Sequence, residues 1–270
     1  MTHPICIIYL YRTTHPVSDF ERFVKGLLKT TKPWSSCVCI LIKGATSPNQ
    51  AQTISSAVEE ISGSFETRLL HLNDAGVDIS AYTYAAKQTR NQFLCFLNTY
   101  SEPLIEGWLD KLAAPVLQGK AGVSGASGAY ETTLPETFFP NPSLRTNAFC
   151  IARSLYLDLR GVDAPDRQAA LVFENGRDSM TRQILERGMR VVVVNGNGEY
   201  FDIDRCNEAN AFRSLGPQNL LVADNRTREY DNADEEGKAR LRRFAWGGSK
   251  PRWRLIRSAL SKGRRLLGLA

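Results

Sequence analysis

The chain has 270 residues, of which 43% are hydrophobic and 23% charged, an ordinary composition for a globular protein. No apolar run approaches the roughly 18 residues that a membrane-spanning helix needs. The six cysteines form no C-x-x-C pair, and the N-terminus lacks the basic region of a secretory signal. We therefore expect a cytoplasmic protein without a transmembrane helix, a signal peptide or a structural zinc site.

The formal net charge of +6 is unevenly distributed. Residues 238–270 contain eleven Lys or Arg and no acidic residue, which leaves 23 basic against 28 acidic residues in the rest of the chain. The body is therefore mildly acidic, and nucleic acid is not expected as a partner, because nucleic-acid-binding domains carry a basic surface.

Two patterns alternate over the first 110 residues. Short apolar runs rich in β-branched and aromatic residues predict buried strands, and apolar residues at helical spacing between them predict helices. This alternation is typical of an α/β fold with a mostly parallel central sheet flanked by helices. The predicted strands are residues 5–11, 37–42, 69–72 and 93–97, and the predicted helices include residues 20–28 and 54–61.

Beyond residue 110 the alternation is less regular. Residues 119–147 are rich in Gly, Ser, Thr and Pro, and residues 217–230 are polar and without periodicity. We expect strands at residues 121–127 and 191–194, helices at residues 151–159, 177–187 and 238–244, and a last basic helix at residues 251–267.

Ligands of parallel sheets bind where the strands end. Here those segments begin at Tyr11, Lys43, Asn73 and Asn98. The two most informative are the polar loop 73–78, which contains Asn73, Asp74, Gly76 and Asp78, and the turn 98–103, which contains Asn98, Tyr100 and Glu102.

In this order, the two segments resemble the donor half of inverting, family 2 glycosyltransferases with a GT-A fold. That family has a loop N-x-G-x-x-x-A, a strand running into the acidic turn L-N-x-D-x-E-P, and a Gly-Trp-Leu helix. The corresponding residues are Asn73 and Gly76, residues 97–103, and residues 107–109. The loop 73–78, with Tyr82 after it, is also similar to the rhamnan-synthesis branch of polysaccharide transferases.

The resemblance covers about residues 3–200 and implies a division of the chain. We expect a GT-A-like domain at residues 1–215, with a donor half at about 1–110 and an acceptor half at about 111–215. Residues 216–270 would form a C-terminal extension with the basic helix. A nucleoside-diphosphate-sugar is the implied donor, and the implied donor-binding residues are Tyr11, Arg12, Lys43, Asn73, Asp74, Gly76, Asp78, Asn98, Tyr100, Glu102 and Arg182.

The chain departs from the family at the acidic turn. In the family, carboxylates there hold a divalent cation, Mg²⁺ or Mn²⁺, which stabilises the leaving diphosphate. Asn98 and Tyr100 occupy those positions here, with Glu102 nearby. Three alternatives remain open: a metal site that uses Asn98 or Glu102, a degenerate site without catalysis, or metal-independent stabilisation by cations such as Arg12, Lys43 and Arg90.

The acceptor half offers a candidate general base. In the family, an acidic pair that opens a helix deprotonates the acceptor hydroxyl. Glu174 is the first choice and Asp178 the second, each at the start of the helix expected at 177–187. Alternatively, both complement the dipole of that helix. Asp74 presents a similar choice between capping a helix and binding the nucleobase.

We therefore expect a glycosyltransferase that moves a sugar from a nucleoside-diphosphate-sugar to a hydroxyl of a glycan or glycolipid. The resemblance implies inversion of configuration. The alternative is a non-catalytic GT-A-like protein that binds a glycan, a nucleotide or a partner enzyme. Residues 250–270, with Trp253 among Lys and Arg, would bind an anionic membrane at its inner face, or would be a solvated basic terminus.

Overall fold

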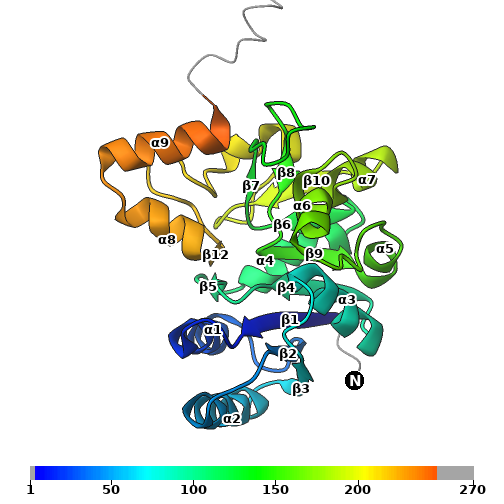
Figure 1. The fold of residues 1–270 in the computed structure, drawn as a ribbon, viewed down its shortest axis with the longest axis vertical. Helices are drawn as coiled ribbons and strands as arrows, with labels where there is room; N and C mark the ends of the chain where they lie inside the picture. Colours follow the sequence, from blue (N-terminus) through cyan, green and yellow to red (C-terminus); the bar gives the residue numbers. More distant parts are fainter. Residues whose placement is uncertain (1–3, 248–270) are drawn as a thin grey trace, which may run out of the picture.

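The computed structural model describes residues 4–247, which form an eight-stranded sheet of strand order β11-β10-β6-β9-β4-β1-β2-β3 (Figure 1). Among those residues, no helix combines the length and the apolar character that crossing a membrane requires. The strands are β1 (Ile5–Arg12), β2 (Cys37–Lys43), β3 (Glu66–Leu72), β4 (Phe93–Leu97), β6 (Val123–Gly125), β9 (Ala148–Ala152), β10 (Val191–Val194) and β11 (Tyr200–Asp202).

The sheet is mixed but mostly parallel. Strands β4, β1, β2 and β3 run parallel to one another, as do β6 and β10. Strand β9 lies antiparallel between β4 and β6, and β11 lies antiparallel at the edge. The predicted α/β fold with a mostly parallel, helix-flanked sheet is confirmed.

Helices cover both faces of the sheet because successive side chains of a strand point to opposite sides. In β1, Ile7 and Tyr9 belong to one buried cluster, and Ile8 and Leu10 to the other. The first face carries α1 (Val17–Thr30), α2 (Pro48–Ser62) and α4 (Trp108–Leu117). The second carries α3 (Asp78–Gln88), α5 (Arg153–Leu157), α6 (Arg167–Asn175), α7 (Met180–Glu186) and the 3-10 segment η1 (Ile203–Ala209).

Strand β9 corrects the sequence prediction. We expected a helix from residue 151, whereas residues 148–152 form a strand and the helix α5 begins only at Arg153. The apolar run that makes β9 is five residues long, and a short apolar run does not distinguish a strand from a buried helical turn.

The C-terminal part of the described chain returns to the sheet. Strand β12 (Val222–Ala223) pairs with β5 (Glu102–Pro103), and helices α8 (Asn225–Asn232) and α9 (Glu235–Trp246) follow. The interpretation of residues 217–230 as irregular is wrong, since α8 begins there, capped by the Asp224 side chain. A second small sheet joins β7 (Gly128–Ala129) and β8 (Ser143–Leu144).

The remaining expectations about organisation are not all tested. The predicted helix at residues 238–244 is confirmed as part of α9. The basic helix predicted at residues 251–267 lies outside the described residues. The division into a domain at 1–215 and an extension at 216–270 stays a prediction, although β12 and β5 join the two parts directly.

Candidate functional site

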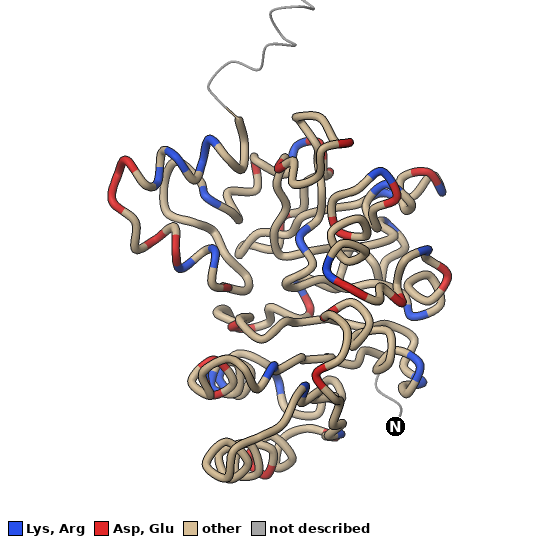
Figure 2. Tube along the Cα trace, in the orientation of Figure 1, with Lys and Arg blue, Asp and Glu red and all other residues tan. Residues whose placement is uncertain are grey.

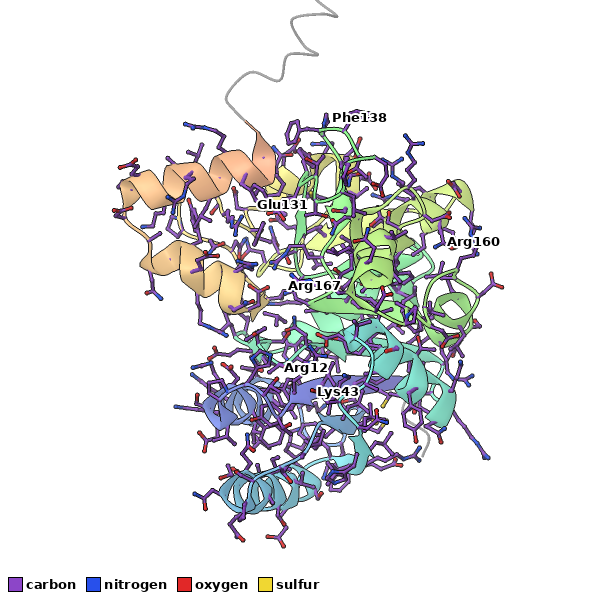
Figure 3. The ribbon with its side chains drawn as sticks, in the orientation of Figure 1. Arg12, Lys43, Glu131, Phe138, Arg160 and Arg167 are labelled. Atoms are coloured by element: carbon purple, nitrogen blue, oxygen red, sulfur yellow. The ribbon has the colours of Figure 1, made fainter. Side chains whose placement is uncertain are left out.

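The carboxyl ends of β1 and β2 place two cations side by side. Arg12 and Lys43 are partners in the parallel register, and Figure 3 shows both at this edge of the sheet. The Lys43 ammonium is buried and donates to the backbone oxygens of Asp74 and Gly76, each at 2.9 Å. Burial, and secondarily Arg12, lower the pKa of Lys43. Lys43 therefore fixes the loop that follows β3.

The loop 73–78 is held by short-range contacts as well. The Asn73 side chain accepts a hydrogen bond from the Ala75 N–H at 3.2 Å. Gly76 has φ +74°, and a Cβ there would lie 2.7 Å from the Ser80 hydroxyl, so glycine is strongly favoured. The interpretation of Asp74 as a helix cap is wrong, because α3 begins at Asp78 with Val77 before it.

Arg12 connects this loop to the site. Its Nε lies 3.4 Å from Oδ1 of Asp78, and its Nη2 donates to the Gly76 oxygen at 3.3 Å. Burial raises the pKa of Asp78, although the nearby Arg12 and Lys43 oppose the shift. One side of the site thus presents a guanidinium beside a carboxyl group that is reluctant to ionise.

In the turn after β4, the side chains at the expected metal positions are already engaged. Oδ1 of Asn98 accepts hydrogen bonds from the Tyr100 N–H at 3.1 Å and the Ser101 hydroxyl at 2.9 Å. The Tyr100 hydroxyl lies 3.1 Å from Nδ1 of His15, on the loop after β1. Asn98 and Tyr100 therefore shape the turn through contacts within the protein.

The third residue of the turn, Glu102, pairs with an arginine that the sequence analysis did not select. Nη1 of Arg228, on α8, lies 3.1 Å from Oε2 of Glu102. Nη2 of Arg228 donates to the backbone oxygen of Tyr100 at 3.0 Å. Within residues 4–247, no group of three or more His, Cys, Asp or Glu is placed to hold a metal ion. The oxygens Oδ1 of Asn98 and Oε2 of Glu102 are instead held by groups of the protein itself.

The general-base candidate Glu174 lies on α6, which covers the same face of the sheet as α3. It occupies the last turn of α6, whereas the next helix begins only at Met180. The predictions that Glu174 opens a helix, and that it complements a helix N-terminus, are therefore wrong. Its Oε1 accepts a hydrogen bond from the Thr146 hydroxyl at 2.5 Å. Burial raises the pKa of Glu174, and the facing Asp78 carboxyl adds to this effect.

Residues 145–147 join the parts of the site. The Asn147 oxygen accepts from the Asn98 N–H at 3.1 Å, beside the Thr146 hydroxyl that binds Glu174. On the other side, Nη2 of Arg145 lies 2.9 Å from Oδ2 of the fully buried Asp224. Burial would raise the pKa of Asp224, but the Arg145 guanidinium and the Thr227 N–H outweigh it and lower that pKa.

Two buried donors around this segment have no hydrogen-bond partner among residues 4–247. They are Nη1 of Arg145 and Nδ2 of Asn147. Burying a polar group without a partner is unfavourable, and such groups concentrate where a ligand supplies the missing partner. These nitrogens favour an anionic or oxygen-rich ligand.

Other predicted residues lie away from this centre. Asp178 is exposed and pairs with Arg160 at 2.5 Å on the outer flank of the molecule (Figure 3). Arg182 donates to Oδ1 of Asn141 at 3.0 Å. Tyr11, by contrast, lies beside the site: its ring is buried, and its hydroxyl donates to the backbone oxygen of His15 at 2.8 Å. Arg90 lines a cavity at the opposite end of the strands, so its expected position near the donor is wrong.

Arg228, Asp224 and His15 belong to the site and were not selected from the sequence. The only signal was the density of polar groups in residues 224–230, which left open a return of that stretch to the site or a surface loop with local ion pairs. The surface-loop alternative is wrong, because Asp224 is buried and Arg228 binds the turn after β4.

Comparisons with known proteins support the fold. Scans of protein-family models and of curated proteins find no match. A solved mannosyltransferase from Pyrobaculum calidifontis, in complex with GDP-Man and Mn²⁺, superposes with a TM-score of 0.53 at 10% identity over 71% of this chain and 54% of that one. GalNAc-T7 with UDP, GalNAc and Mn²⁺ gives 0.51 at 14% identity over 72% and 42%.

The chain therefore has a GT-A-like fold, the fold of nucleotide-sugar glycosyltransferases, and spans about half the length of these two proteins. The GT-A resemblance is confirmed at the level of the fold. Its family 2 and rhamnan-synthesis aspects stay predictions.

Proposed function

We propose that the chain transfers a sugar from a nucleoside-diphosphate-sugar to a hydroxyl of a glycan or glycolipid. The observation that carries this proposal is the junction at residues 145–147. It connects the turn that follows β4, the partly buried Glu174 and the Arg145–Asp224 pair. A base, cations and unpartnered donors thus lie around one edge of a GT-A-like sheet.

In the proposed reaction, Glu174 takes the proton of the acceptor hydroxyl as the oxygen bonds to the anomeric carbon. The nucleoside diphosphate leaves from the opposite side with the bonding electron pair, so the configuration inverts. A general base works best when its pKa lies near the operating pH. Burial of Glu174 moves its pKa in that direction.

The negative charge of the diphosphate would be balanced by arginines. Arg228 and Arg12 flank the turn after β4, and each already contacts a backbone oxygen of the site. Guanidinium groups present several N–H donors in a fixed plane and suit phosphate recognition. This part of the proposal assigns to Arg228 and Arg12 the role that a metal has in the family.

The base assignment is tested with Glu174→Gln, which keeps the shape and removes the acid–base function. We expect turnover to fall at least about 100-fold, the lower range for general-base catalysis, while the affinity for the nucleoside diphosphate stays unchanged. Asp178→Asn is the matched control, since its carboxyl is exposed and bound to Arg160. Equal losses in both variants would reject Glu174 as the base.

The cation assignment is tested by titrating nucleoside diphosphates and their sugars by calorimetry, with EDTA and with Mn²⁺. We expect affinity without added metal, and a loss of about tenfold or more in Arg228→Met, equivalent to about 1.4 kcal/mol. Arg226→Met is the control, because Arg226 lies on the same helix and its side chain is 55% exposed. Binding only with Mn²⁺ would overturn the assignment.

A non-catalytic binding protein is the second candidate. It is favoured by one observation: the Asn98 side chain is engaged by Tyr100 and Ser101, and Glu102 by Arg228. Nucleotide binding without sugar transfer or donor hydrolysis, across a panel of glycan and lipid-linked acceptors, would support this candidate against the transferase.

For the acceptor side, we propose that the basic C-terminus brings the protein to an anionic membrane. Residues 248–270 contain seven Lys or Arg. In the described part, the second half of α9 carries arginines (Figure 2), and Phe244 and Phe138 are 55% and 75% exposed. We expect flotation with phosphatidylglycerol vesicles but not phosphatidylcholine vesicles, and its loss on deleting residues 249–270. Unchanged flotation of the truncated protein would contradict the proposal.

A further inference from the structure

Two cysteines are paired across neighbouring strands at the end of the sheet opposite the candidate site. Cys6 on β1 and Cys37 on β2 are partners in the parallel register, and their side chains lie on the same face. Neighbouring strands lie about 4.8 Å apart, within the Cα separation of about 4.4–6.8 Å that disulfides use. All six cysteines are free thiols in this structure.

A cavity of about 890 Å³ opens onto this pair. It lies at the amino ends of β1, β2 and β3, where Cys6, Cys37 and Glu66 line it. Cys37 is partly exposed there, whereas Cys6 is only 2% exposed. The cavity is in the size range of about 300–1,000 Å³ that small-molecule sites occupy. Its charged lining residues are Glu66, Arg68 and Arg90.

The pKa values of the two thiols shift in opposite directions. The interaction of the Cys6 thiol with the Cys37 sulfur lowers the pKa of Cys37 despite its partial burial, and raises that of Cys6. Burial raises the pKa of the neighbouring Cys39 to about 12. Cys37 is thus the more accessible of the two thiols and the one whose pKa is lowered, and the thiolate is the nucleophile in thiol–disulfide exchange.

A second cysteine pair provides an internal comparison. Cys95 and Cys150 are also register partners, on β4 and β9. Both are fully buried, and burial raises the pKa of each. Cys95 and Cys150 are thus close to each other, as Cys6 and Cys37 are, but neither is exposed to solvent and neither has a lowered pKa. The pair therefore shows what proximity alone does, without an accessible thiol.

We propose that Cys6 and Cys37 form a redox-active dithiol, in which Cys37 reacts with small disulfides that carry carboxylates and Cys6 resolves the product. The Cys37 thiolate attacks one sulfur of the small disulfide and expels one thiolate. The Cys6 thiolate then attacks the Cys37 sulfur and expels the second. Two protein thiols are oxidised to one disulfide, and the two leaving thiolates take up the two protons. Arg68 and Arg90 would attract the carboxylates.

The test uses the full-length protein, oxidised glutathione as the probe, and intact-mass analysis with peptide mapping. We expect the chain without substitutions to form the Cys6–Cys37 disulfide. Cys6→Ser should accumulate one glutathione adduct at Cys37, and Cys37→Ser should form neither product. Cys150→Ser, the matched control, should behave like the unmodified chain. Failure of Cys6→Ser to hold an adduct at Cys37, or equal labelling at other cysteines, would overturn the proposal.

Two further measurements guard against indirect effects. Circular dichroism and thermal melting must show that each variant folds, and phenylarsine oxide, which bridges two close thiols, gives a second readout. We expect stoichiometric binding that is lost in either Cys6→Ser or Cys37→Ser and kept in Cys150→Ser. Binding that survives both substitutions would also overturn the proposal. The inference does not rest on the transferase function. Nucleotide affinity is therefore measured on the same variants, so that a failure of one proposal can be told apart from a failure of the other.

Discussion

Replacing Asp224 by Asn removes one charge from the ion pair that fastens the C-terminal segment to the site. The Asp224 side chain is fully buried, its Oδ2 lies 2.9 Å from Arg145, and its Oδ1 accepts the Thr227 N–H at 2.8 Å as the cap of α8. Asn is as good a helix cap as Asp. Asp224→Asn therefore leaves the cap in place and leaves the Arg145 guanidinium without its partner.

The magnitude follows from the burial of the two groups. Breaking a buried ion pair by removing one partner is destabilising by about 3–5 kcal/mol. The Arg145 side chain is 18% exposed, so water retains some access to it. We expect Asp224→Asn to lower the free energy of unfolding by about 3 kcal/mol. Asp224→Ala also loses the cap and should lower it by about 4 kcal/mol.

The assay is urea unfolding at pH 7, extended to a double-mutant cycle with Arg145→Met. Each single variant strands the opposite charge, whereas the double variant strands neither. The double variant should therefore be more stable than the sum of the single effects predicts, by about 2 kcal/mol. Additive effects, or a loss below about 0.5 kcal/mol in Asp224→Asn, would refute the inference that this pair holds the segment.

The pH dependence gives an independent check. The pKa of Asp224 is lowered in the folded protein, so its contribution is fully present above the unfolded value of about 3.9. That contribution is lost as the pH falls through the folded pKa. The stability difference between the unmodified chain and Asp224→Asn should thus be largest at neutral pH and shrink below about pH 4. A difference that grows on acidification would contradict the assigned direction.

The other predictions concern the same site. Burial raises the pKa of Glu174, so the ionised carboxylate destabilises the folded protein at pH 7 and Glu174→Gln should be more stable than the parent there. This gain should vanish below about pH 4, where the carboxyl is protonated in both states. A loss of stability at pH 7 in urea unfolding would contradict it. Tyr82→Phe removes a buried hydroxyl without a partner among residues 4–247 and should raise the unfolding free energy by about 1 kcal/mol, with a decrease as the refuting result. Lys43→Met frees the loop 73–78 and should weaken nucleotide binding about tenfold by calorimetry; unchanged affinity would separate Lys43 from the donor site.

The first half of the fold could be predicted because its signals are local. Residues 37–42 and 93–97 are continuous apolar runs, and the helices between the strands repeat their apolar residues at helical spacing. The second half lacks such signals. Strand β9 owes its place between β4 and β6 to pairing with both neighbours, which five residues of sequence do not encode.

The site divides in the same way. Asn98 and Glu102 could be located because they follow a strand whose end is a ligand-binding position. Arg228 could not, because it lies 126 positions from the carboxylate it binds. Glu174 was selected by resemblance, but its place in α6 was not predicted, since the boundary between α6 and α7 depends on the Ser179 cap. Chain order therefore identifies single residues better than the partners that position them.

The arginines of the site already pair with carboxylates of the protein, and a diphosphate would have to bind them without displacing those carboxylates. Arg12, Arg145 and Arg228 each face a carboxylate, respectively Asp78, Asp224 and Glu102.

A guanidinium has five N–H donors, so it can bind a phosphate of the ligand without releasing the carboxylate that it already contacts. Arg145 keeps a buried nitrogen, Nη1, that has no hydrogen-bond partner among residues 4–247, whereas Nε of Arg12 faces Asp78. Asp224 can thus fix the orientation of Arg145 while Nη1 remains available to a ligand. In a turn that has Asn98 and Tyr100 where the family has carboxylates, this sharing would make oriented guanidinium groups, rather than the acidic turn, the main determinant of donor binding.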